Sequence, residues 1–231
     1  MRKWGSSINS LKTIKKPIIM ATITEGINGG FSGKAGTVIG ARWRDIPYMR
    51  STPASVSNPK SQGQLDHRAK LATIVQFLKP LTAFVRIGFD SQAVRMSGFN
   101  AAVKYNYHHA ITGTYPDFVL DYSRVLVSSG TLTGALNPQV SSTTACQVEF
   151  RWENNSNGLT ARSNDRVLLV VYNPRLQVAV TMEGGNNRES GRQSISVPSS
   201  FIGDEVQCYI AFEKARDAVV SDSQYLGSIV V

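Results

Sequence analysis

The chain has 231 residues, of which 42% are hydrophobic and 9% aromatic, and its formal net charge is +9. These proportions are ordinary for a globular protein that buries a core. No continuous apolar run approaches the roughly 18 residues that span a bilayer, and the basic start lacks the apolar stretch of a secretory signal. We therefore expect no membrane partner, and a protein that is cytoplasmic or released by lysis.

The excess of positive over negative charge lies entirely in the first half of the chain. Residues 1–120 hold 16 Lys and Arg against 5 Asp and Glu, whereas residues 121–231 hold 9 against 11. Such an asymmetry favours a polyanionic partner, most often nucleic acid. A basic surface that only aids solubility accounts for the excess equally well, so both interpretations stay open.

Residues 1–19 are predicted to form a flexible basic arm, because they hold five Lys and Arg and no acidic residue. Met20 supports this, since it opens "MATITEGINGG", which looks like an alternative start. The region 20–117 then begins with a glycine-rich, β-prone segment. In it "TVIGARW" and "IPYMRS" flank "RD" and predict a hairpin. One face would carry Ile39, Ala41 and Trp43, and the other Val38 and Arg42. Pro47, which has no N–H to donate, suits an edge strand.

Three helices are expected before residue 117, over residues 60–79, 80–89 and 97–113. Asn58 is placed to cap the first helix, with Pro59 at its first position. Pro80 interrupts the apolar periodicity and separates the first helix from the second. Gly113 is expected to end the third helix.

From residue 118 onward the apolar period changes to two, which is typical of strands. Turn-forming stretches such as "NNSNG" and "EGGNNRESG" separate the strands. We expect strands at 118–128, 131–136, 145–152, 166–172, 177–182, 193–197, 205–213 and 224–231. The sequence therefore predicts an α+β, mainly β protein, with a Gly-rich N-terminal β-hairpin, a small helical segment and an antiparallel β-sandwich over 118–231. The sandwich is of immunoglobulin or fibronectin III character, and Trp152 follows Cys146 too closely for an antibody-type domain.

The two cysteines, Cys146 and Cys208, lie in alternating apolar patterns, so both thiols are expected to point into a core. A bridge between them would need an oxidising compartment. Because no secretion signal precedes them, free thiols are the favoured expectation.

Several long blocks carry a resemblance to a known family: "GGFSGKAGTVIGARW", "NPKSQGQLDHRAKLATIVQFLKPL" and "SVPSSFIGDEVQCYIAFEKARDAVVSDSQYLGSIVV". From about residue 20 the chain resembles an uncharacterised family of Bacteroidota and phage-associated proteins, a domain of unknown function. The resemblance implies no activity. It does imply that the glycine-rich segment belongs to the domain and is not a linker.

Catalytic and metal sites find little support in the sequence. A phosphate-binding P-loop would need Gly where Asn28 stands and Ser or Thr where Ala35 follows Lys34, and a strand-like segment comes next instead of a helix. The histidines His67, His108 and His109 form no chelating pattern. Asp and Glu are scattered, mostly at turns. We therefore expect no enzyme, no cofactor, no metal and no small-molecule substrate.

The strongest candidate site is a set of basic residues that would contact nucleic acid: Arg2, Lys3, Lys12, Lys15, Lys16, Lys34, Arg42, Arg44 and Arg50. Phe31, Trp43 and Tyr48 lie between the last four. Aromatic rings can stack on bases, but a place in the core is the favoured expectation for these rings.

Three functions from different classes remain. The leading hypothesis is a non-catalytic structural or assembly protein, such as a phage or phage-derived virion component. Its basic half would contact neighbouring subunits or DNA or RNA, and its glycine-rich hairpin would add to a neighbour's sheet. The second is a stand-alone nucleic-acid-binding or polyanion-binding module. The third, an extracellular adhesin or carbohydrate-binding module, rests on fold analogy alone.

Overall fold

The structure is a computed structural model that describes residues 22–23, 30–43, 46–55, 58, 60–215, 217 and 219–231. It divides into two compact units, with the boundary between Asn58 and Pro59. Each unit is described by itself.

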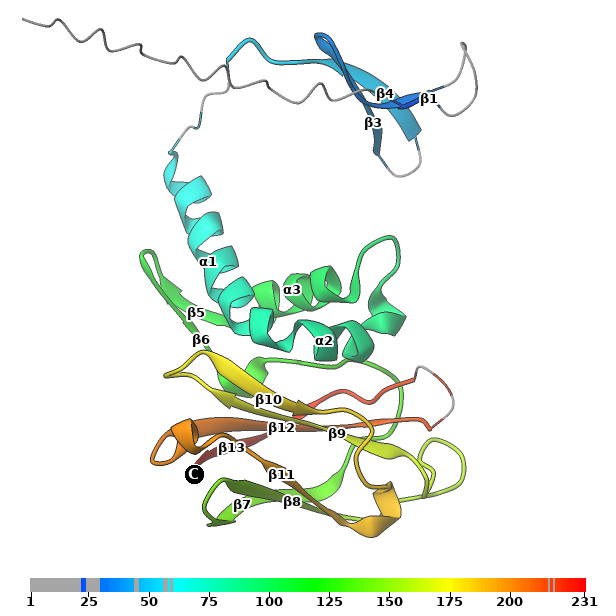
Figure 1. Ribbon diagram of the computed structural model, residues 1–231, viewed down its shortest axis with the longest axis vertical. Helices are drawn as coiled ribbons and strands as arrows, with labels where there is room; N and C mark the ends of the chain where they lie inside the picture. Colours follow the sequence, from blue (N-terminus) through cyan, green and yellow to red (C-terminus); the bar gives the residue numbers. More distant parts are fainter. Residues whose placement is uncertain are drawn as a thin grey trace, which may run out of the picture. The chain divides into compact units, whose positions relative to one another are not determined.

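The N-terminal unit is an antiparallel meander (Figure 1). Its strands are β1 (Thr22–Ile23), β2 (Phe31–Ala35), β3 (Val38–Trp43) and β4 (Ile46–Ser51), in the spatial order β1-β2-β3-β4. The predicted hairpin is confirmed as β3 and β4, and β4 is the edge strand that Pro47 indicates.

The second unit begins with a helical layer. It contains α1 (Gln62–Leu78), α2 (Thr82–Gly88) and α3 (Gly98–His109), with short 3-10 turns η1 (Lys79–Leu81) and η2 (Asp90–Gln92). Pro80 lies in η1, where it separates the first two helices as predicted. Two predicted helix ends are wrong. The N-cap of α1 is Ser61 and not Asn58. Gly113, with a φ of 89°, lies in the strand β5 that follows α3.

After the helices come a hairpin, β5 (Ile111–Thr114) with β6 (Asp117–Leu120), and η3 (Tyr122–Arg124). A β-sandwich follows. One of its sheets has the order β10 (Val178–Met182), β9 (Arg166–Asn173), β12 (Glu205–Glu213) and β13 (Gln224–Val230). The other has the order β11 (Arg192–Ser196), β8 (Gln147–Glu153) and β7 (Leu136–Thr144), and η4 (Arg188–Ser190) and η5 (Ser199–Phe201) lie in the connections. The two antiparallel sheets, of four and three strands, confirm the predicted mainly β sandwich, and this division agrees with the expected immunoglobulin or fibronectin III character.

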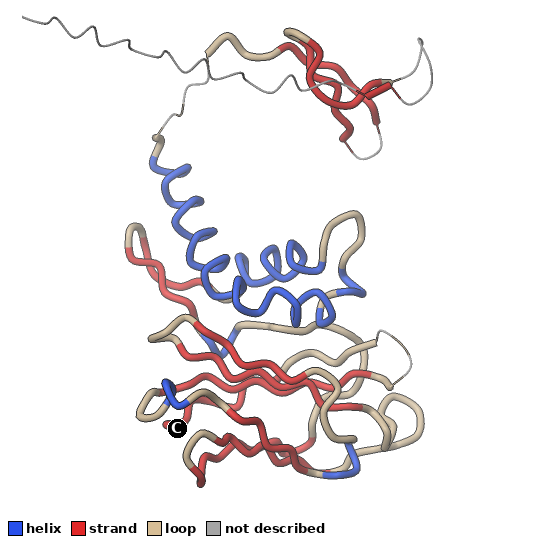
Figure 2. Tube along the Cα trace, in the orientation of Figure 1, coloured by secondary structure: helices blue, strands red, loops and turns tan. Residues whose placement is uncertain are grey.

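The sheet β10-β9-β12-β13, which we call the central sheet, lies between the helices and the second sheet, β11-β8-β7 (Figure 2). Leu168, Val170 and Tyr172 of β9 pack with the helical residues, whereas Leu169 and Val171 pack with the second sheet. Because β9 and β12 are covered on both faces, their sequences read as nearly continuous apolar runs. Three layers therefore form one body, although the sequence places the helices and the sandwich on either side of residue 117.

Two predicted strands are wrong. Of the segment 118–128 only the first residues form a strand, because Asn106 of α3 takes the place of a neighbouring strand. Its amide donates to the Leu126 carbonyl at 2.8 Å, and its Oδ1 accepts from the Leu126 N–H at 2.9 Å. The alternating burial of Val125 and Val127 arises from contact with the helical core and not from a sheet. The segment 131–136 forms only isolated bridges, and the strand β7 starts at its last residue.

One helical stretch, Gln62–Gly88, is long and apolar enough to cross a membrane by length and composition, although no continuous apolar run reaches that length. Its apolar side chains have another explanation. Ile74, Leu78, Leu81 and Phe84 are buried in the core that the helices share with the central sheet.

Candidate interaction surface on the N-terminal sheet

The strand register decides which side chains of the N-terminal sheet share a face. Lys34 lies opposite Ile39, and Ile39 lies opposite Arg50. Residues directly opposite one another in antiparallel strands point to the same side. Tyr48, two residues before Arg50, therefore also lies on this side, which we call the Lys34 face. The opposite side, the Met49 face, carries Phe31, Val38, Arg42 and Met49 by the same alternation.

The glycines of this sheet have structural roles. Gly36 adopts a φ of 60° in the two-residue turn between β2 and β3, where hairpin turns require positive φ. Gly40 is buried on β3, and a Cβ there would lie 2.1 Å from the Phe31 carbonyl oxygen and 2.8 Å from the Phe31 ring. The Phe31 ring thus covers the backbone of Gly40. Lys34 lies in a hairpin, where no helix N-terminus follows to hold phosphate.

The outer strand β4 is exposed along its whole length. Its apolar side chains point to both faces, with Met49 71%, Ile46 59% and Tyr48 42% exposed. The Thr52 N–H donates to the Thr37 carbonyl at 2.7 Å, so the even-numbered residues of β4 direct their backbone polar groups towards β3. The odd-numbered residues Pro47, Met49 and Ser51 direct theirs away from the sheet. Among the described strands, none pairs with this outer side of β4.

The structure brings together only part of the predicted basic site. Lys34 and Arg50 share a face and are exposed, whereas Arg42 points to the other side of the sheet. The other predicted residues lie outside the described part of the chain: Arg2, Lys3, Lys12, Lys15, Lys16 and Arg44. For Phe31 the favoured packing role agrees with its position over Gly40. Tyr48 does not belong to a core.

The histidines and cysteines belong to the second unit. His67 Nδ1 is 2.7 Å from the Tyr107 hydroxyl, and the His109 ring stacks on Tyr105 at 4.3 Å. Among the described residues, no group of three or more His, Cys, Asp or Glu side chains is placed to hold a metal ion.

The cysteine prediction is half correct. Cys208 is buried in the sandwich core, and its burial raises the pKa of the thiol to about 12. The prediction for Cys146 is wrong, since this residue occupies the tight turn between β7 and β8 with a φ of 61° and is only half-buried. The two thiols are free.

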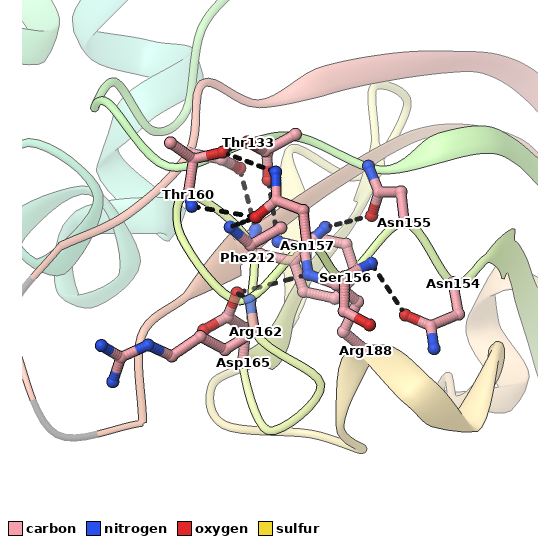
Figure 3. A network of polar contacts seen from close by, with 12 residues as sticks. Thr133, Asn154, Asn155, Ser156, Asn157, Thr160, Arg162, Asp165, Arg188 and Phe212 are labelled. Carbon is pink, nitrogen blue, oxygen red and sulfur yellow. Dashed lines mark hydrogen bonds and ion pairs between the residues drawn. The ribbon is translucent and has the colours of Figure 1, made fainter.

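Sequence reasoning missed a buried ion pair at one end of the sandwich (Figure 3). Arg188 Nε lies 3.3 Å from Asp165 Oδ2, and both side chains are fully buried. The Arg188 guanidinium also donates to the carbonyls of Thr133 and Gly134 and to Asn155 Oδ1, at 2.8, 2.9 and 2.7 Å. Burial lowers the pKa of Arg188 and outweighs the opposing effect of Asp165. Both residues stand in turn-rich sequence, which offers no signal of burial.

Comparison with known proteins gives one finding. A family model described as "Family of unknown function (DUF6266)" matches residues 30–227. No curated protein matches the chain. The matched range contains β2, β3 and β4 as well as the helices and the sandwich, so the glycine-rich segment is part of the family and not a linker.

Proposed function

Because the chain belongs to the Family of unknown function (DUF6266), and this membership implies no activity, we propose a function from the structure. We propose that the protein is a non-catalytic structural or assembly protein whose N-terminal sheet lies against neighbouring subunits. The observation that carries the proposal is the exposure of β4, an edge strand with apolar side chains on both faces. Unpaired edges and exposed apolar patches are typical of surfaces that associate.

The two units differ in how much core they bury. The second unit encloses two apolar clusters, one between the helices and the central sheet and one between the two sheets. In the described part of the N-terminal sheet, Gly40 alone is buried. A small sheet with so little buried surface gains stability by packing against another surface. This contrast supports a second unit that is stable by itself and an N-terminal sheet that is stabilised by binding a neighbouring subunit.

The test is the molar mass of the full chain, measured by size-exclusion chromatography with light scattering over a range of concentrations. We expect masses above that of the monomer, rising with concentration. Met49→Asp places a charge on the edge strand and should return the protein to a monomer. The matched control is Leu159→Asp in the second unit, where Leu159 is 87% exposed. A strict monomer at high concentration contradicts the proposal, as does equal association of the two variants.

A polyanion-binding module is the second candidate, favoured by the position of Lys34 and Arg50 on either side of Ile39 with Tyr48 on the same face. It predicts binding to a single-stranded oligonucleotide that weakens steeply with salt. The double variant Lys34→Gln/Arg50→Gln should bind more weakly than Lys104→Gln/Arg192→Gln, which removes two exposed charges elsewhere. Binding that is absent or insensitive to salt contradicts this candidate.

The finer hypothesis, a phage or phage-derived virion component, stays a prediction that rests on the resemblance. The location in the cytoplasm or a virion and the absence of catalysis also stay predictions, the first from the lack of a secretory signal and the second from the lack of catalytic motifs. The adhesin hypothesis gains nothing from the sandwich itself, because this fold carries many unrelated functions.

A further inference from the structure

We propose that β4 of one copy pairs antiparallel with β4 of a second copy, with Met49 opposite the partner's Met49 on a two-fold axis. This inference rests on the proposed function, since it names the partner of the N-terminal sheet and the register in which the two strands pair. It joins two four-stranded sheets edge to edge. A two-fold interface of this kind uses the same surface on both copies.

The backbone supplies the first argument. Met49 and Ser51 direct their N–H and C=O groups away from β3, and Pro47 directs only a carbonyl there. With Met49 on the axis, the two Met49 residues exchange a closely spaced pair of hydrogen bonds. Each Ser51 N–H then faces the partner's Pro47 carbonyl. Pro47 has no N–H to donate, so one hydrogen bond is absent at each of the two ends of the ladder.

The side chains supply the second argument, because the same register places Tyr48 directly opposite the partner's Arg50. Arg50 and Tyr48 are both exposed and share the Lys34 face. Opposite residues in such a pair have close side chains, and a guanidinium over a tyrosine ring is attractive. The two-fold axis repeats this contact on the other side of Met49. The edge is therefore complementary to itself.

Neighbouring registers are worse for identifiable reasons. Moving the axis to Arg50 sets two guanidinium groups directly opposite each other, and like charges in this position are destabilising. Moving it to Tyr48 sets each Pro47 opposite the partner's Met49, so both central bond pairs lose a donor. Arg50 and Pro47 thus exclude the two alternatives, and the register with Met49 on the axis remains.

Disulfide trapping in the full chain tests the register. All variants carry Cys146→Ser, because Cys146 is only half-buried, whereas Cys208 is buried. Under mild oxidation we expect Met49→Cys to form a covalent dimer. We expect none from Lys34→Cys, which lies two strands from the edge, since cysteines with Cα atoms more than about 7 Å apart cannot be bridged. Arg50→Cys should give less dimer than Met49→Cys.

The outcomes separate the inference from the proposed function. A monomeric mass for the unmodified chain overturns both. An oligomeric mass with no dimer from Met49→Cys overturns the β4 register and leaves the assembly proposal standing. Preferred trapping of Arg50→Cys also overturns it. Because Lys34, Met49 and Arg50 are exposed, each cysteine variant should keep the circular dichroism spectrum of the Cys146→Ser protein. A variant without an engineered cysteine gives an independent measurement. Met49→Pro removes the N–H that residue 49 directs away from the sheet, and it should return the protein to a monomer.

Discussion

The guanidinium of Arg188 lies over the ring of Phe212, with its carbon 3.8 Å from the ring centre, in the interior of the sandwich. The ring covers one side of a cation whose edges donate to Asp165 and to loop carbonyls. Trp152 completes the cluster, because its ring packs edge-on against Phe212 and its Nε1–H donates to the Arg188 carbonyl at 2.7 Å. One buried cation thereby fixes the loops at this end of both sheets.

Replacing Arg188 by Met should therefore destabilise the protein strongly. The substitution leaves the Asp165 carboxylate buried without its partner, and breaking a buried pair in this way costs about 3–5 kcal/mol. Urea denaturation measures the loss. The double variant Asp165→Leu/Arg188→Met should recover part of it, because no buried charge remains.

The matched control is Arg175→Met, which removes a cation from the Arg175–Asp204 pair, where the arginine is largely exposed. Exposed pairs contribute little compared with buried ones, so this variant should lose much less stability than Arg188→Met. Equal losses from Arg175→Met and Arg188→Met contradict a special role for the buried pair.

Two glycine-to-alanine substitutions should have opposite effects. Gly40→Ala forces a Cβ into the Phe31 backbone, so the N-terminal sheet should lose protection in amide hydrogen exchange over β2–β4 and the chain should associate less. Gly63→Ala lies in the first turn of α1, where a Cβ meets nothing within 4 Å, and should stabilise the helix by up to about 1 kcal/mol. Unchanged exchange in Gly40→Ala would show that Phe31 does not constrain this position.

The two thiols should differ sharply towards a thiol reagent such as iodoacetamide. The thiolate is the reactive form, and burial raises the pKa of Cys208 to about 12, whereas Cys146 lies half-buried in a turn. Native protein should therefore be alkylated once, and Cys146→Ser not at all until urea unfolds it. Mass spectrometry counts the modifications. Rapid labelling of native Cys146→Ser would contradict the buried position of Cys208.

The sequence predicts the fold where pattern and packing agree, and fails where a distant side chain decides. The strands β9 and β12 are apolar almost throughout, and the β3–β4 hairpin shows its turn and its edge proline. The strand β7 contains Pro138 and two irregularities in its pairing, and it reads as a polar connection. Its place depends on β8 and not on its own pattern.

The candidate surface was predicted only in part for the same reason. The alternation of β3 gives the faces of Ile39 and Arg42, but only the pairing register shows that Lys34 and Arg50 meet across Ile39. The Asn106 contacts with Leu126 and the Arg188–Asp165 pair join residues 20 and 23 positions apart. Local propensity carries no information about such partners.

The last prediction concerns pH and Asp204. Arg175 donates to both carboxylate oxygens of Asp204, and Asn173 Nδ2 donates at 2.7 Å, so these hydrogen bonds lower the pKa of Asp204. A folded-state pKa below the unfolded value contributes stability above the ordinary aspartate value near 3.8, and this contribution is lost as the pH falls through the folded pKa.

Asp204→Asn should accordingly be less stable than wild type at neutral pH, with a difference that shrinks as the pH falls below that value. Thermal unfolding between neutral and strongly acidic pH measures the difference. The control is Asp90→Asn, which changes an exposed carboxylate in η2 and should follow the wild-type curve throughout. A difference between Asp204→Asn and wild type that stays constant down to strongly acidic pH would mean that the ionised carboxylate is not what stabilises the loop before β12.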